Sequence, residues 1–153
     1  MKALLTAIKT QLQTDLTYVR ASDIFITEDE NLIPEAVKFP AVGLKDGPVQ
    51  RIEMIGGMME YRMTVKIIAL VQLTKPEAAI MGDTSTGKKG ILDLEADIHE
   101  SLDENLLSIT GMTSAVALAN QAESEVFGDD VEVIQRKIIG YEYVKETERP
   151  SGA

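Results

Sequence analysis

Residues Val49 to Leu73 read VQRIEMIGGMMEYRMTVKIIALVQL, and this stretch decides the fold. Two apolar-rich runs flank the pair Gly56-Gly57, and glycine favours the positive φ angles that the tightest hairpin turns require. In the second run, apolar side chains from Tyr61 onward alternate with polar ones, which is the period of a half-buried strand. The stretch therefore predicts a long β-hairpin.

Two amphipathic helices are predicted on either side of this hairpin. Apolar residues recur every three to four positions over residues 1–16, which is the spacing of one helix face. A second helix is expected to begin near Gly90 and to end before Gly111. Its predicted apolar arc consists of Ile91, Leu94, Ile98, Leu102 and Leu106.

The remaining β segments are shorter. Strands are predicted at 24–27 and 39–44, the latter closed by the turn residues 45–48, and residues 74–90 are expected to form a turn-rich connection. A closing hairpin is predicted from residues 114–127 and 131–145 around a turn at 128–130.

Grouped strands with two helices predict an α+β fold, with a mixed or mostly antiparallel sheet, two main helices on one face and the long hairpin. We expect a single domain over residues 1–145 and a flexible tail over 146–153.

Composition narrows the chemistry. The 153 residues include no cysteine and one histidine, which excludes a disulfide scaffold, a thiolate metal site and a cysteine nucleophile. His99 lies at the boundary between the apolar arc and the acidic face, where a hydrogen-bonding role is favoured over catalysis. We find no targeting segment, and no apolar run approaches the length of a membrane span.

Charge is concentrated in one part of the chain. The formal net charge is −10, and residues 90–135 hold eleven Asp and Glu but no Lys or Arg. Four of these carboxylates are predicted on the polar face of the second helix, where a structural or interaction role is favoured over cation binding. This predicted acidic surface consists of Asp93, Asp97, Glu100 and Glu104.

One string resembles a catalytic motif. Residues Gly82 to Lys88 match the Gly-x-x-x-x-Gly-Lys core of a phosphate-binding loop, but Lys89 stands where a Ser or Thr would bind Mg²⁺. A flexible connection is the favoured interpretation, and a nucleotide-dependent enzyme is the alternative. We otherwise expect no catalytic residue, no cofactor and no metal.

Contact residues are predicted around the hairpin turn and in the closing strand. Methionine adapts its shape to a partner, and an apolar hairpin tip that projects beyond its domain calls for one. The predicted interface residues are Met54, Met58, Met59, Tyr61, Tyr141 and Tyr143.

Three segments carry a resemblance to a known family: Phe39 to Leu44, Tyr61 to Leu73, and Gly90 to Ile98. With the element order, they resemble the tail-terminator proteins of tailed bacteriophages. The resemblance implies a structural virion protein, not an enzyme, that forms a ring of about six subunits by sheet and hairpin contacts. The ring would cap the tail tube, contact the tube protein and a neck or head-completion protein, and let DNA pass without binding its sequence.

The same resemblance implies a location in the tail or neck of the virion, reached from the host cytoplasm during assembly. An acidic lumen suits DNA passage, because phosphate-binding surfaces are rich in Lys and Arg instead. Head-completion proteins and other neck connectors have similar sizes and stay as alternatives. A monomeric binding module is a further one.

Overall fold

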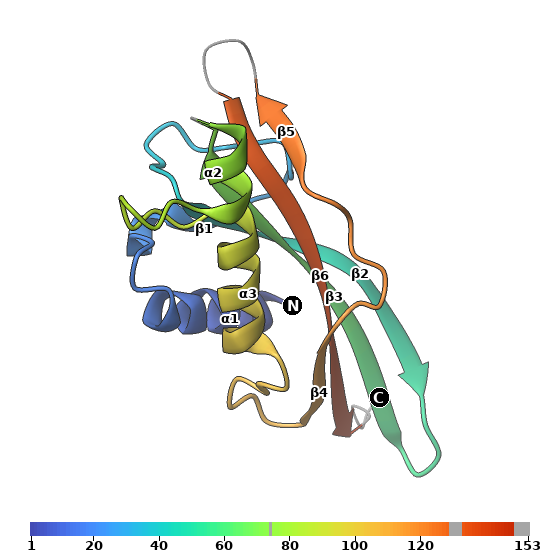
Figure 1. The fold of residues 1–153 in the computed structure, drawn as a ribbon. Helices are drawn as coiled ribbons and strands as arrows, with labels where there is room; N and C mark the ends of the chain where they lie inside the picture. Colours follow the sequence, from blue (N-terminus) through green and yellow to red (C-terminus); the bar gives the residue numbers. More distant parts are fainter. Residues whose placement is uncertain (74, 129–132, 149–153) are drawn as a thin grey trace.

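The computed structural model of this chain describes residues 1–73, 75–128 and 133–148. Its elements are α1 (Lys2–Asp15), a 3₁₀ turn (Ala21–Asp23), β1 (Ile24–Ile26), β2 (Ala41–Glu53), β3 (Met58–Gln72), α2 (Pro76–Met81), α3 (Ile91–Leu102), β4 (Met112–Ala117), β5 (Glu125–Gly128) and β6 (Val133–Glu148). The six strands form one sheet in the order β1-β2-β3-β6-β4, with β5 also paired to β6. Helices α1 and α3 lie on one face of this strongly twisted sheet (Figure 1).

The fold class is the predicted one. β1 runs parallel to β2, and the other pairings are antiparallel, so the sheet is mixed but mostly antiparallel. β2 and β3 form the predicted hairpin, which turns at Gly56-Gly57 with φ angles of 87° and 77°. β3 then pairs with β6 along its whole length, from Met58 opposite Glu148 to Gln72 opposite Ile134.

β2 is longer than predicted. Residues 45–48 were expected to close a strand, but they continue it through a register shift between Asp46 and Val49. A Cβ atom on Gly47 would lie 2.7 Å from the Thr64 carbonyl oxygen, so glycine permits the close approach of the two strands. Turn-forming residues here build a bulge inside a strand rather than its end.

The main core lies between the sheet and the two long helices. α1 and α3 each bury one face, and alternate residues of β3 and β6 meet them. Full burial of each large apolar side chain contributes roughly 1.5–3 kcal/mol. The helix side chains in this core are Leu4, Leu5, Ile8 and Leu12 of α1 and Ile91, Leu94, Ile98 and Leu102 of α3.

The second helix is shorter than predicted, because α3 ends at Leu102. Leu106 was placed in its apolar arc but is exposed, outside the helix. The Asn105 side chain donates to the Ser101 carbonyl and accepts the Leu107 N–H, and such local bonds compete with helix continuation. Gly111, predicted near the helix end, instead leads into β4 with a φ of 85°.

The opposite face of the sheet is covered at one end only. A smaller core forms there from Ala41, Ile68, Leu70 and Ile134, and the segment over residues 27–40 packs against it. Half-buried Phe25, Ile33, Val37 and Phe39 complete this layer. No helix of the described ranges covers the rest of this face, which an antiparallel sheet tolerates because polar side chains can face water.

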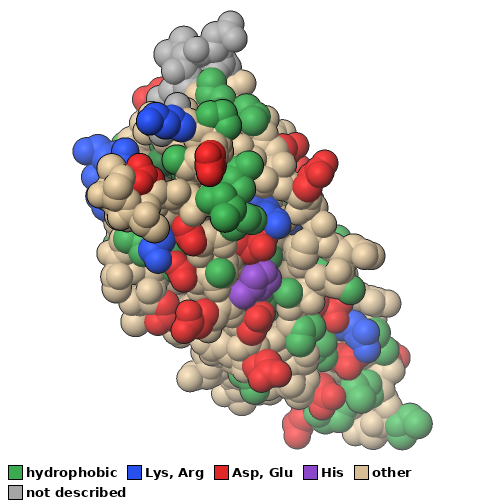
Figure 2. Space-filling view, in the orientation of Figure 1, with side chains coloured by type: hydrophobic (Ala, Val, Ile, Leu, Met, Phe, Trp, Pro, Cys, Tyr) green, Lys and Arg blue, Asp and Glu red, His purple; other side chains and the backbone are tan. Residues whose placement is uncertain are grey.

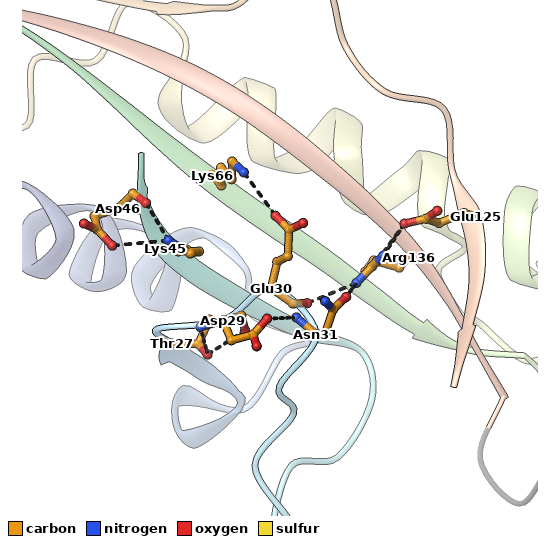
Figure 3. Close-up of polar contacts among 9 residues, drawn as sticks. All are labelled: Thr27, Asp29, Glu30, Asn31, Lys45, Asp46, Lys66, Glu125 and Arg136. Carbon is orange, nitrogen blue, oxygen red and sulfur yellow. Dashed lines mark hydrogen bonds and ion pairs between the residues drawn. The ribbon is translucent and has the colours of Figure 1, made fainter. Parts of the chain in front are cut away.

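Arg136 of β6 fastens this layer to the sheet (Figure 3). Arg136 is 7% exposed, and its guanidinium forms an ion pair with Glu125 of β5. It also donates to the Glu30 carbonyl at 3.1 Å and to the Asn31 side-chain oxygen at 2.8 Å. Lys66 of β3 adds an ion pair of 3.2 Å with Glu30. The segment at 27–31 is thus bound to both central strands.

The closing β segment differs from the predicted hairpin. The run 114–127 is divided into β4 and β5, and both pair with β6 at different places along it. Between them, the Gln121 side chain accepts the Gly140 N–H and donates to the Gly140 carbonyl. Its amide thus makes the two backbone hydrogen bonds that a neighbouring strand would make there. The expected turn at 128–130 lies partly outside the described residues.

Two further boundaries depart from the sequence analysis. β6 continues to Glu148, so the first residues of the predicted tail are paired with β3, and residues 149–153 lie outside the described part. The connection over 74–90 contains the unpredicted helix α2, which begins at Pro76. Proline suits the first helical position, because its φ is already helical and its missing N–H would be unpaired there.

Asp23 joins three parts of the chain before the sheet begins. Its buried carboxylate accepts from the Arg20 guanidinium at 2.7 and 3.0 Å and from the Lys38 N–H at 3.0 Å. The Arg20 hydrogen bonds, more than the Lys38 bond, hold the pKa of Asp23 below its ordinary value of 3.8 although burial opposes this. The carboxylate is therefore stabilising in its charged form.

We predict that Asp23→Ala lowers the free energy of unfolding by about 1–3 kcal/mol at pH 7, since it leaves buried donors unpaired. A depressed pKa contributes stability above pH 4 that is lost as the pH falls through the folded-state value. The difference between variant and parent should therefore shrink below about pH 4 in urea titrations. Asp46→Ala, at an exposed ion pair, is the control and should change little. A constant difference down to pH 2 would contradict this.

Candidate functional site

The hairpin tip presents unpartnered apolar side chains. The Met54 N–H donates to the Met58 carbonyl at 2.9 Å and closes the turn. Ile55 is fully exposed, Met54 is 40% exposed and Met58 is half-buried. None of the described residues lies within 4 Å of where a side chain on Gly56 or Gly57 would begin. The sequence analysis named the two methionines but missed Ile55. Its position beside the glycine pair of the turn could have identified it as a tip residue.

Two other predicted interface residues lie behind the tip. Met59 is buried, and its sulfur accepts from the Arg51 guanidinium at 3.4 Å. Tyr61 is half-buried, with the Arg51 guanidinium 5.7 Å from its ring centre. Both side chains point to the helix side of the sheet, because they alternate with Glu60 along β3. Met59 supports the hairpin and is not a surface contact.

Tyr141 and Tyr143, also predicted as contacts, lie inside the core with no exposed surface. They face α3 from β6, and their rings lie 6.2 Å apart. This placement corrects the prediction for this chain as folded: strand periodicity identified their common face but not that α3 covers it. Burial raises the pKa of both phenols.

The two tyrosines differ in their hydrogen bonds. The Tyr141 hydroxyl donates to the Asp103 carboxylate at 2.6 Å and lies 2.6 Å from His99 Nδ1. Since the phenol has one proton, Nδ1 of His99 carries the proton in the second bond. The hydrogen-bonding role predicted for His99 is therefore observed. The Tyr143 hydroxyl is buried and finds no partner among the described residues.

The four predicted acidic residues do not form one stripe. Asp93 accepts the Gly90 N–H at 3.0 Å and caps its own helix. Asp97 accepts the Tyr18 hydroxyl at 2.5 Å and pairs with Lys89 at 3.7 Å. Burial, more than the Asp97 bond, raises the pKa of Tyr18. Asp93 and Asp97 thus have structural partners.

Glu100 is exposed on α3, whereas Glu104 lies beyond the helix end with a φ of 59°. Acidic side chains surround the histidine on this face of the molecule (Figure 2). Bases from just outside residues 90–135 reduce the charge: Lys137 pairs with Glu95 at 2.5 Å, and Arg136 pairs with Glu125. Within the described residues, no three His, Cys, Asp or Glu side chains converge as metal ligands.

The phosphate-loop alternative lacks its structural context. A phosphate-binding loop follows a strand, whereas this loop follows the helix α2. Asp83 N–H and Lys88 N–H bond each other's carbonyls, and the Asp83 carboxylate accepts the Ser85 N–H and hydroxyl. These bonds hold the pKa of Asp83 below its ordinary value. A carboxylate therefore already uses a loop N–H that a phosphate would need.

Comparison with known proteins finds a likeness in fold and none in the sequence searches. No family model and no curated protein matches the sequence. One solved structure that the fold matches is a chain from the virion of a native gene transfer agent particle. The match has a TM-score of 0.56 and 13% identity and covers 93% of this chain and 94% of that chain. This chain therefore shares its fold with a virion component over nearly its whole length. Among the described residues, no helix is long and apolar enough to cross a membrane.

The tyrosine pair generates a stability prediction. Tyr141→Phe should lower the free energy of unfolding by about 1–2 kcal/mol, because it removes the bond to a carboxylate. Tyr143→Phe removes a buried hydroxyl without a partner and should be neutral or stabilising by up to about 1 kcal/mol. Urea unfolding of both variants is the measurement. Equal losses would mean that the Tyr143 hydroxyl has a partner in solution.

Proposed function

We propose that this chain is a structural protein of a phage-like virion. The observation that carries the proposal is the shared fold, which extends over 93% of this chain and 94% of a virion chain. A match over nearly the full length of both chains means that the shared unit is most of the architecture, not a small common substructure. In this role the chain acts through shape and contacts, with no catalytic step.

More specifically, we propose a tail terminator that forms a ring, of about six copies, at the end of the tail tube. The resemblance in element order and in the segments 39–44, 61–73 and 90–98 supports this role. A head-completion or other neck protein is the runner-up. The ring would contact the tube protein on one side and a neck protein on the other, in the virion tail, after assembly in the host cytoplasm.

The projecting hairpin supplies a contact for such an assembly. Its tip, Met54 to Met58, displays apolar side chains that the described residues leave uncovered. Burial of one large aliphatic side chain contributes roughly 1.5–3 kcal/mol, so one tip residue changes an association constant about tenfold or more. The remaining exposed carboxylates, including Glu100, would face water or a DNA channel.

Native mass spectrometry tests the ring directly. The purified chain should form a discrete ring alone or when purified tail tubes are added, and tube ends should carry it in electron micrographs. A chain that stays monomeric with tubes present would contradict the terminator role. A ring that ignores tubes but binds portal-bearing heads would favour the head-completion alternative.

Ile55→Asp should weaken assembly at least tenfold and leave the free energy of unfolding within about 0.5 kcal/mol, because the side chain is fully exposed. The matched control is Met81→Asp, an exposed apolar residue on α2, remote from the tip along the sheet. Size-exclusion chromatography and urea unfolding measure the two quantities. Assembly unchanged in Ile55→Asp would remove the tip from the interface.

A further inference from the structure

The two edges of the sheet are covered at one end of the molecule and open at the other. On one side, β1 pairs with β2 at residues 42–44 only. On the other side, β5 pairs with β6 at residues 133–136, and β4 is the outermost strand at the hairpin end. Among the described residues, no strand pairs with the outer side of β4 or with the outer side of β2 over residues 46–52.

These two open edges lie at the same level of the sheet. Gln50 of β2 is opposite Arg62 of β3, which is opposite Val144 of β6, which is opposite Ser114 of β4. Three antiparallel pairings separate β2 from β4, so these two strands point in opposite directions. A neighbour placed beside the sheet without a shift would therefore add its β2 to β4 as an antiparallel partner.

The residues on the two edges are chemically complementary. Val49 is 51% exposed and Arg51 is exposed, and both face the helix side of β2. Beside β4, on the same side, lies a groove of about 410 Å³. It is lined by Asp103, Glu104, Ala115, Val116 and Ala117.

A valine and an arginine fit a groove with small apolar residues and two carboxylates. The Glu104 N–H bonds the Ala115 carbonyl at 2.9 Å, which leaves that oxygen a second lone pair. β4 carries no charge and no proline, the devices that usually protect an edge strand, and Val116 is 45% exposed.

We infer that copies of this chain join by pairing β2 residues 49–52 of one copy with β4 of the next, which makes one continuous antiparallel sheet. The inference rests on the proposed ring and names its contact. The contact is heterologous, because different surfaces of the two copies meet, and such contacts generate rings when the rotation closes. The two open edges lie at the same position along the strand direction. Each copy is therefore not displaced along the strands relative to its neighbour, as a closed ring requires. The helices of every copy then lie on the same side of the joined sheet.

Paired cysteines test this contact, and the chain has no cysteine of its own. In Gln50→Cys with Ser114→Cys, both thiols lie on the face opposite the helices. They are about 14 Å apart within one chain, given about 4.8 Å between strands, so they can bond only between copies. Oxidation should give a ladder of linked chains up to the closed ring on a denaturing gel. Ile52→Cys with Ser114→Cys detects the same pairing with its register shifted by two residues.

The control is Gln50→Cys with Val126→Cys, which places the second thiol on exposed β5 at the other end of the sheet. The edge pairing is supported by a ladder from either β4 pair and none from the control. It is overturned if native mass spectrometry shows rings but neither β4 pair forms a ladder, or if the control forms one equally. Monomers without cross-links, with tail tubes present, would overturn both the edge pairing and the proposed function.

A charge exchange provides an independent readout of the same contact. Arg51→Glu should weaken the ring about tenfold, Glu104→Arg should do the same, and the double variant should recover most of the loss. Glu104 is exposed, so Glu104→Arg should unfold at the urea concentration of the parent. Arg51→Glu also loses the contacts with Met59 and Tyr61, so urea unfolding of each variant must first show that it is folded at the concentration used for assembly. Additive losses in the double variant would exclude this pair from the interface.

Discussion

The pairing of β3 with β6 is the constraint on which the rest of the structure depends. Fifteen consecutive residue pairs join the two strands, from Met58 opposite Glu148 to Gln72 opposite Ile134. The long helices pack on one face of this pair, and each other strand adds to it or to a strand already paired with it. Because side chains alternate between faces, a slip of one residue would expose the buried set, including Ile67 and Tyr141, and bury charges in its place. The core thus specifies the register.

The β3–β6 pairing is longer than the segments that pack on the sheet. One end of the sheet is therefore covered and the other end is open. At the end near Gln72, the segment over 27–40 and the Arg136 clamp cover the face opposite the helices. At the end near Met58, the strands extend into a hairpin tip with exposed Ile55. The covered end satisfies its polar groups within one chain. At the open end, backbone edges and apolar side chains stay uncovered by the described residues, and the proposed assembly surface lies at this end.

The sequence predicts which helices and strands form better than it predicts where they end and which of their faces are buried. The hairpin follows from Gly56-Gly57 and strict alternation, and both long helices follow from their apolar spacing, because these signals are local. The bulge at 45–48 depends on Thr64 of the next strand, and the end of α3 depends on side-chain bonds from Asn105. The burial of Tyr141 and Tyr143 depends on which face the helices choose. None of these is visible in a window of neighbouring residues, so the predicted interface mixed tip residues with core residues.

The charge distribution also differs between the sequence and the folded chain. Residues 90–135 contain no base, yet Lys89, Arg136 and Lys137 come from the two flanks and pair with Asp97, Glu125 and Glu95. Asp93 is used as a helix cap and Asp103 as the acceptor for Tyr141. A paired carboxylate exerts a weaker field at a distance, because its partner cancels much of it. The acidic surface therefore narrows to side chains that are exposed without such partners in the described residues, such as Glu100 and Glu104. Glu104 lines the groove beside β4, so a charged and an apolar feature meet there.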